Sequence, residues 1–198
     1  MEFRHVVRRR RMVRNYTSDP VPDEVVDRLL AHAIRGPSAG FSQGWAFLVL
    51  DADEDVRRFW AATTPDEPTY TSWLEGMSRA PVVIVPLSNK SAYLERYAEP
   101  DKGWTDRDES RWPAPYWDID TGMAALLMLL TAVDEGLGAC FFGIPPDRIG
   151  RFREEFGVPR EFTPIGAITV GHPAPDRGSP SLKRGRRGLD EVVHRGSW

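Results

Sequence analysis

The chain has 198 residues, 41% of them hydrophobic, which is enough for one well-buried core and typical of a single domain. The formal net charge is −3 and the pI is about 5.8, whereas a nucleic-acid-binding domain usually has a broad basic face and a high pI. Basic charge is instead concentrated at two places: residues 1–14 hold six Arg and one Glu, and residues 177–187 hold five Lys or Arg and no acid. We therefore expect one domain over residues 1–198 and no nucleic-acid surface.

The sequence also argues against export, a structural metal and a membrane span. A twin-arginine signal needs an apolar stretch directly after its arginines, but polar residues 14–19 follow the Arg run at 8–11. Cys140 is the single cysteine, and the four His are scattered without metal-ligand spacing. The longest apolar run, residues 123–133, is too short to span a bilayer. We expect a cytoplasmic protein without a metal site.

The first half of the chain predicts two helices and two strands. Apolar residues recur at helical spacing from 22 to 33, after a Pro and two acids that are typical of a first turn. Short runs rich in β-branched or aromatic residues, 45–50 and 81–87, predict buried strands. A shorter helix is expected between them, at about 54–62.

Residues 88–118 have weak periodicity and many aromatic rings among Pro, Gly and charged residues. We expect an aromatic loop or lid here, with one helix near 91–97. Its rings are Tyr93, Tyr97, Trp104, Trp112, Tyr116 and Trp117.

The second half begins with a helix over residues 120–135 that is apolar on nearly every side. Such a helix must be covered all round, by a large fold or by a second subunit, and in a short chain a subunit interface carries serious weight. The sequence then predicts a strand, a helix and a strand, followed by a basic C-terminal extension at about 172–198. The ranges of these three elements are 139–144, 147–156 and 164–171. No simple βαβ alternation runs through the chain, which favours the α+β class.

Some candidate motifs have ordinary structural explanations. The Gly136-Leu137-Gly138 segment lacks the third glycine of a dinucleotide fingerprint and follows a helix, so it is better explained as a helix stop. Cys140 lies in an apolar run, where a packed thiol is more common than a nucleophile.

Two segments could bind a ligand. Residues 36–45 combine small residues, which expose backbone groups, with a Ser, a Gln and two aromatics. That composition suits a flat heterocycle, although an ordinary helix-to-strand loop explains it equally well. The basic segments 8–14 and 183–187 are either solvated or converge on one small polyanion, because Arg is suited to bidentate phosphate contact.

Several blocks occur in a fixed order: Arg10–Tyr16, Pro20–Pro22, Leu29–Leu30, Pro37–Trp45, Gly136–Gly143 and Leu189–Val193. This order resembles the FMN-dependent nitroreductase superfamily over most of the chain. The resemblance implies an α+β, nitroreductase-like three-layer sandwich, in which helices flank a central, mostly antiparallel sheet. It also implies an intertwined homodimer with two FMN sites at the subunit interface, and helix 120–135 would lie in the dimer core.

The resemblance further implies a set of FMN-binding residues. The N-terminal segment, with Met12 among its arginines, and the C-terminal arginines would bind the phosphate and ribityl chain, and the remaining residues would lie near the isoalloxazine. The set is Arg10, Arg11, Met12, Arg14, Pro37, Ser38, Ala39, Gln43, Phe142, Gly143, Arg184 and Arg186. Three residues depart from the family pattern: Met12 replaces a hydroxyl residue, Phe41 the common Asn, and Gly44 the common Pro.

The implied activity is hydride transfer from NADH or NADPH through FMN to a planar acceptor such as a nitroaromatic, quinone or enone. No catalytic side chain is expected, and the lid would stack on the acceptor. One alternative is a flavin storage or sensor protein. Another is a flavin-cleaving enzyme that makes dimethylbenzimidazole, because Gly40-Phe41 with Gln43 and Trp45 also resembles that branch of the superfamily. That branch has an Asp at the position of Met12, and Met cannot supply a carboxylate. A basic-tailed protein that binds nucleic acid or acidic partners is the third.

Overall fold

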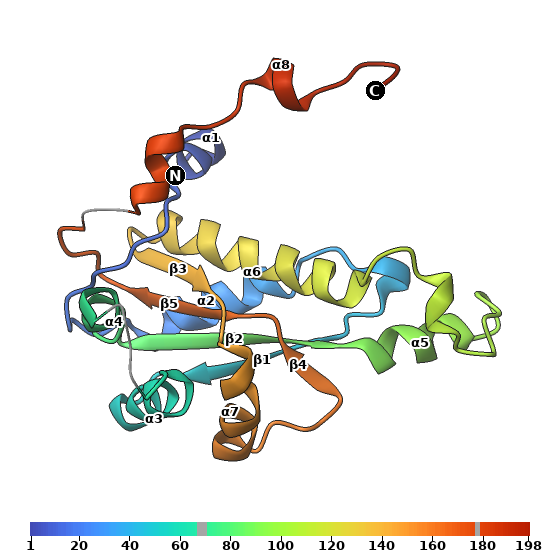
Figure 1. Ribbon diagram of the computed structural model, residues 1–198, viewed down its shortest axis with the longest axis horizontal. Helices are drawn as coiled ribbons and strands as arrows, with labels where there is room; N and C mark the ends of the chain where they lie inside the picture. Colours follow the sequence, from blue (N-terminus) through green and yellow to red (C-terminus); the bar gives the residue numbers. More distant parts are fainter. Residues whose placement is uncertain (67–70, 177–178) are drawn as a thin grey trace.

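A five-stranded sheet forms the middle layer of the molecule (Figure 1). The computed structural model describes residues 1–66, 71–176 and 179–198. The strands are β1 Trp45–Leu50, β2 Val82–Asn89, β3 Gly138–Phe142, β4 Phe162–Pro164 and β5 Ala167–Gly171. They are ordered β1-β2-β5-β3, β4 also pairs with β2, and every ladder between these strands is antiparallel. This arrangement confirms the predicted α+β class and antiparallel sheet.

Helices cover both faces of the sheet. The helices are α1 Phe3–Arg9, α2 Asp23–Ala33, α3 Asp53–Thr63, α4 Thr71–Met77, α5 Lys90–Ala98, α6 Tyr116–Asp134, α7 Ile149–Phe156 and α8 Leu189–Val192. Figure 1 shows α2 and α6 over one face and α3 and α7 over the other. The flanking helix layers are those expected of a nitroreductase-like sandwich.

The alternation of side chains along β2 builds both cores. Val82 and Ile84 pack with α2 and α6, whereas Val83 and Val85 pack with α3 and α7. All four are at most 2% exposed, because successive side chains of a strand point to opposite faces and here both faces are covered. A strand buried on both sides reads as a continuous apolar run, which is why the sequence predicted it well.

Helix α6 is longer than predicted, because Tyr116 and Trp117 belong to its first turn after Pro115. Within the described residues it is the one helix long and apolar enough to cross a membrane by length and composition. Its buried residues, such as Ala125 and Met128, pack against α2 and the sheet, as in a core helix. Leu126 remains 46% exposed, so the chain alone does not cover every side of this helix.

The structure corrects the predicted elements at several points. Helix α4 and the short strand β4 were not predicted, because seven and three residues are too few to give a clear period. The predicted lid 88–118 contains the helix expected near 91–97, which is α5, but its last residues belong to the start of α6. Strand β3 ends at Phe142 rather than at residue 144.

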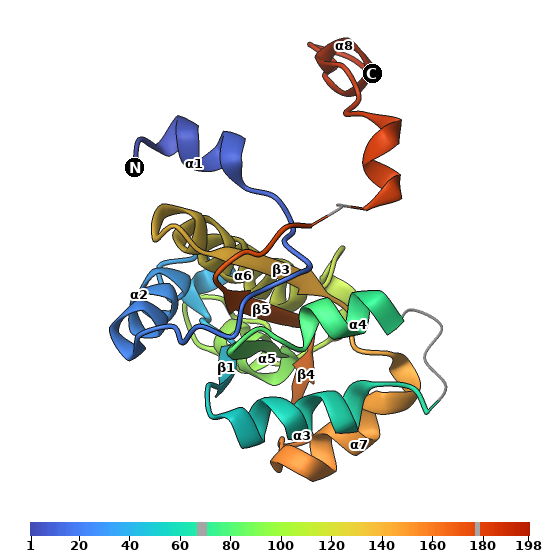
Figure 2. The same cartoon turned by 90° about the vertical axis from the view of Figure 1, so that its left-hand side faces the viewer.

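Both ends of the chain project from the sandwich. Figure 2 shows α1 and the C-terminal extension leaving the body in different directions. Apolar side chains are exposed on both, with Phe3 72% exposed and Trp198 100% exposed. A groove of about 400 Å³ lies beside α1, lined by Met1, Phe3, Val6, His32, Arg35, Leu127, Leu130, Thr131 and Asp134.

The buried thiol of Cys140 predicts a loss of stability at alkaline pH. Burial raises the pKa of Cys140 from 9.0 to about 11, so the folded protein keeps its proton at pH values where the unfolded chain loses it. The free energy of unfolding should therefore fall as the pH rises from about 9 towards 11. In urea unfolding across this range, the free energy of unfolding should fall less steeply with pH for Cys140→Ala. This variant should be less stable already at pH 9, because the substitution leaves a cavity. Equal slopes in the two proteins would contradict the prediction.

Candidate functional site

The segment that follows α1 runs beside β3 and positions the N-terminal arginines. Met12 forms a parallel bridge with Ala139, and the Val13 N–H donates to the Ala139 carbonyl at 3.0 Å. The Phe141 N–H points at the Met12 sulfur, 3.4 Å away. Met12 therefore acts here as a packing residue against the sheet, and the backbone of Arg14 is fixed by the pairing beside it.

A carboxylate from the C-terminal side lies among these arginines. The Arg14 N–H donates to Asp176 Oδ2 at 3.0 Å, and Arg11 Nη1 lies 3.6 Å from the same oxygen. The Asp176 side chain is 9% exposed. The chain thus places an oxyanion of its own against a backbone N–H and a guanidinium, which is the donor set that a phosphate group requires.

A cavity of about 440 Å³ opens beside Arg14, a volume within the range of roughly 300–1,000 Å³ that is usual for small-molecule sites. Its lining residues are Arg14, Asn15, Ser72, Trp73, Glu75, Gly76, Arg79, Pro175, Asp176, Ser179 and Pro180. Across it, Arg79 Nη1 donates to Asn15 Oδ1 at 3.1 Å. The wall is mixed in charge, and Arg14 is the one residue of the predicted set that lines it.

Helix α4 supplies a wall of this cavity that the sequence analysis missed. A Cβ at Gly76 would lie only 2.3 Å from the Arg14 carbonyl oxygen, so glycine is what allows α4 to approach the arginine segment. An isolated glycine near an apolar run was the available signal, because such a residue often marks a close backbone approach.

Phe142 and Gly143 lie at the end of β3, beside a second and much smaller cavity of about 40 Å³. The Phe142 ring stacks on Trp60, with centroids 5.5 Å apart and planes 5° apart. Trp73 contacts Phe142 edge-on and lines both cavities, so the end of β3 and the Arg14 cavity share a wall.

The loop with Pro37, Ser38, Ala39 and Gln43 is held by a buried carboxylate on α6. Asp120 is 2% exposed, and its Oδ2 accepts the Ala39 N–H at 2.8 Å and the Tyr93 hydroxyl at 2.8 Å. Inside the loop, Gln43 N–H donates to Ser38 Oγ at 3.1 Å. Burial, followed by the hydrogen bond to Asp120, raises the pKa of Tyr93, so the hydroxyl stays protonated and donates.

The aromatic residues of the predicted lid pack on one another and support this loop. Tyr97 and Trp112 have ring centroids 4.5 Å apart, and Trp112 also contacts Tyr93 edge-on at 5.9 Å. A Cβ at Gly40 would lie 2.6 Å from the Tyr97 ring, so the loop lies directly on the cluster. Stacking of these rings on an acceptor stays a prediction.

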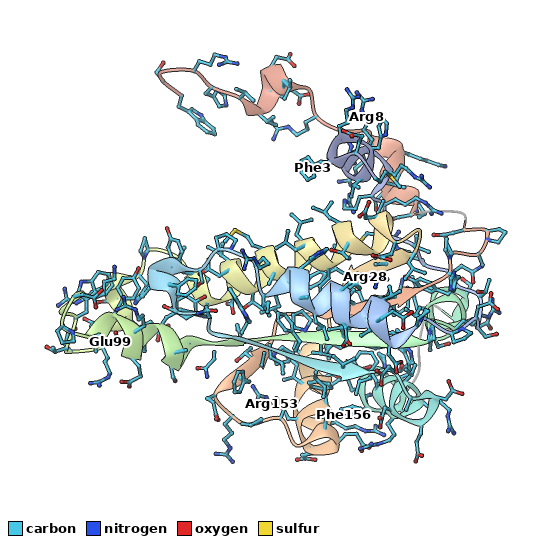
Figure 3. The ribbon with its side chains drawn as sticks, turned by 180° about the vertical axis from the view of Figure 1, so that it is seen from behind. Phe3, Arg8, Arg28, Glu99, Arg153 and Phe156 are labelled. Carbon is cyan, nitrogen blue, oxygen red and sulfur yellow. The ribbon has the colours of Figure 1, made fainter. Side chains whose placement is uncertain are left out.

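Within one chain, the predicted cofactor residues form separate groups. Figure 1 shows residues 10–16 at one end of the sandwich and the loop after α2 at the other, next to α5. Figure 3 gives the same separation, with Arg8 on α1 and Glu99 after α5 at opposite ends. Arg10 lies at the end of α1, where its N–H donates to the Val6 carbonyl at 2.9 Å.

The C-terminal arginines form a third group. Arg184 ends the short helical turn Pro180–Arg184, and Arg186 follows it; both are exposed. This segment leaves the body away from α1 in Figure 2. One chain therefore brings Arg11, Met12 and Arg14 together beside β3, but it does not bring residues 37–43 or the C-terminal arginines to them.

Among the described residues, no group of three or more His, Cys, Asp or Glu side chains is placed to hold a metal ion. The arrangement is that of an α+β sandwich with a polar cavity beside an arginine segment.

Comparison with known proteins identifies the class. The profile of the Nitroreductase family matches residues 7–172. A Methanothermobacter thermautotrophicus protein provisionally named NADH dehydrogenase/NAD(P)H nitroreductase is 28% identical over 184 residues, covering 92% of this chain and 83% of that protein. The NADH dehydrogenase of Thermus thermophilus is 27% identical over 204 residues, covering 93% and 91%.

A solved structure from Desulfovibrio desulfuricans, in complex with FMN, is 25% identical and superposes with a TM-score of 0.73, covering 100% of this chain and 98% of that one. The chain belongs to the nitroreductase family, as the order of its sequence blocks predicted.

Loss of the Asp120 carboxylate should destabilise the loop and the fold. Asp120→Ala leaves the Ala39 N–H and the Tyr93 hydroxyl without their acceptor, which should lower the free energy of unfolding by roughly 2–4 kcal/mol. Urea unfolding measures this change, and limited proteolysis should cut the loop 37–44 faster. Asp27→Ala, at an exposed position on α2, is the control and should change stability by less than about 0.5 kcal/mol. Equal losses in both variants would contradict the role given to Asp120.

Proposed function

We propose that this protein is an FMN-dependent oxidoreductase that passes reducing equivalents from NADH or NADPH to a planar acceptor such as a nitroaromatic, quinone or enone. We propose further that residues 1–198 act as one FMN-binding domain and that the working unit is a homodimer. Membership of the nitroreductase family and the FMN complex of a 25% identical structure support the cofactor. The donor is supported by the names of the relatives.

The observation that carries this proposal is the cavity beside Arg14. It has the volume of a small-molecule site and adjoins a position where Arg11 and the Arg14 N–H already hold an oxyanion, Asp176. The residues present therefore fit the phosphate end of FMN. In our proposal Arg10, Arg11 and Arg14 bind the phosphate and ribityl chain, and the strand end at Phe142 and Gly143 lies near the ring.

The separation of the predicted residues supports a dimer. Residues 37–43 lie at the opposite end of the sandwich from Arg14. If both groups contact one FMN, they would therefore come from two subunits. The projecting α1, the groove beside it and the exposed Leu126 offer apolar surface for such an assembly. Arg184 and Arg186, on the projecting C-terminal extension, would reach the phosphate in the assembled dimer.

When bound, FMN would supply the hydride chemistry, and the chain's residues would bind, orient and desolvate it. The arginine segment would fix the phosphate through charge-assisted hydrogen bonds. The loop 37–43, held by Asp120, would present backbone groups at a fixed place, because its own hydrogen bonds keep it rigid. No side chain is required to carry a proton, and Cys140, with its raised pKa, is buried as a thiol.

The direct test is the colour of the purified protein. We expect flavin absorbance that persists through gel filtration and bleaches anaerobically when NADH or NADPH is added. A flavin that stays oxidised with both donors would favour the storage, sensor or flavin-cleaving alternatives. A colourless protein that also fails to bind added FMN would contradict the proposal and favour the basic-tailed interaction protein.

Subunit complementation tests whether one site uses two chains. Arg14→Ala should lower FMN affinity by about tenfold to a hundredfold, since a charge-assisted hydrogen bond contributes about 1.5–3 kcal/mol. Ser38→Trp should also lose flavin, because a bulky ring replaces the hydroxyl that holds Gln43. A hybrid dimer made by co-expressing the two variants with different tags should regain one FMN per dimer, since one of its two sites has no substitution.

Arg8→Ala is the matched control for Arg14→Ala. Arg8 lies on α1, exposed, and should leave FMN affinity within about twofold of the unchanged protein. If the site lay within one chain, each subunit of the hybrid would keep its own defect, and no flavin would be regained. That result would overturn the two-chain arrangement while leaving the flavin assignment intact.

A further inference from the structure

The loop 37–44 holds a large aromatic residue in an unfavourable backbone conformation. Phe41 has φ of 56°, and Gly40 before it and Gln43 after it have φ of 60° and 49°. Glycine adopts this left-handed region freely, but a bulky side chain does so at a cost in free energy. Among the described residues, three that are not glycine have positive φ, and two of them are in this loop.

The surrounding structure enforces this conformation. Asp120 holds the Ala39 N–H, and Arg96 Nε donates to the Gly40 carbonyl at 2.9 Å. Ser42 Oγ donates to the Ala39 carbonyl at 2.7 Å, which closes the turn from inside. Gly40 lies against the Tyr97 ring, and a Cβ atom at this position would clash with that ring. The strain is therefore fixed by contacts from α5 and α6.

Within the single chain, the strained residue gains no burial in return. Phe41 is 75% exposed, although a phenyl ring normally stabilises a fold through the apolar area it buries. A polar residue that favours the left-handed region, such as Asn, would remove both costs. A residue that is strained, exposed and rigidly held is typical of a functional position rather than of a core.

We propose that Phe41 determines acceptor specificity, by stacking on the planar substrate at the flavin site. This inference rests on the proposed function, in which the loop 37–43 of one subunit lines the site whose Arg14 belongs to the other. Phe41 offers an aromatic face and no hydrogen-bonding group, so it favours a flat apolar acceptor over a small polar one. The hydrogen-bonded loop fixes the Phe41 ring in its exposed position before the acceptor binds, which reduces the conformational entropy lost on binding.

The test replaces Phe41 by Asn in the dimeric holoprotein. Phe41→Asn should melt at a higher temperature because the strain is relieved, and it is compared with the unchanged protein after both are loaded to the same FMN occupancy. Its dissociation constant for 1,4-naphthoquinone, measured with the oxidised protein and no reductant, should rise about tenfold. Reoxidation of the reduced protein by naphthoquinone should slow by a similar factor, whereas reoxidation by ferricyanide should change by less than about twofold.

Phe41→Tyr and Phe41→Leu are the matched variants. Tyr keeps the aromatic face and should bind naphthoquinone within about twofold of the unchanged protein, whereas Leu keeps apolar bulk only and should weaken binding. Unchanged naphthoquinone binding in Phe41→Asn would overturn the proposal, and so would equal slowing with both acceptors.

A Phe41→Asn protein that sediments as a monomer would also overturn the proposal, because Phe41 would then be a subunit contact. If the unchanged protein binds no FMN, or is not bleached by either nicotinamide, the oxidoreductase proposal itself fails, and this one fails with it.

Discussion

The burial of β2 on both faces is the constraint on which the rest of the structure depends. This strand pairs with β1, β4 and β5, and its alternating side chains support the α2 and α6 layer on one side and the α3 and α7 layer on the other. Helix α6 therefore lies along the sheet (Figure 1), with Asp120 in its early turns and its far end near α1. Because this helix spans the sandwich, the loop that Asp120 holds and the arginine segment are kept apart within one chain.

The sequence predicted the elements whose own pattern is strong. Strands β1 and β2 and helix α2 have continuous or periodic apolar residues. An apolar pattern indicates which residues are buried, and burial decides the structure of these elements. Helix α4 has no such pattern. Glycine is needed at position 76 because the backbone of Arg14, which is distant in sequence, approaches closely there. The start of α6 was missed because aromatic residues before a helix look like a loop until Pro115 is recognised as its beginning.

The candidate site was harder to predict than the fold, for a physical reason. The types of residue in the arginine segment and in the loop 37–43 indicated an anion and a flat ring, and the ordered blocks indicated the family. Nothing local in the sequence pairs Arg14 with Asp176, or brings Asp120 to Ala39, since these contacts join residues more than 80 positions apart. Contacts of that kind depend on the complete fold. Sequence patterns therefore indicate which residues could bind a ligand but not how these residues are arranged in space.

Division of a site between two chains has a thermodynamic consequence. If FMN contacts both subunits, it binds the dimer and not the separated chains, so cofactor binding and association must strengthen each other by the same free energy. Asp176 gives the arginine segment an internal counter-charge, which limits repulsion among Arg11 and its neighbours. If the proposed FMN site is correct, the mixed charge of the cavity wall would keep the arginine segment stable while the site is empty.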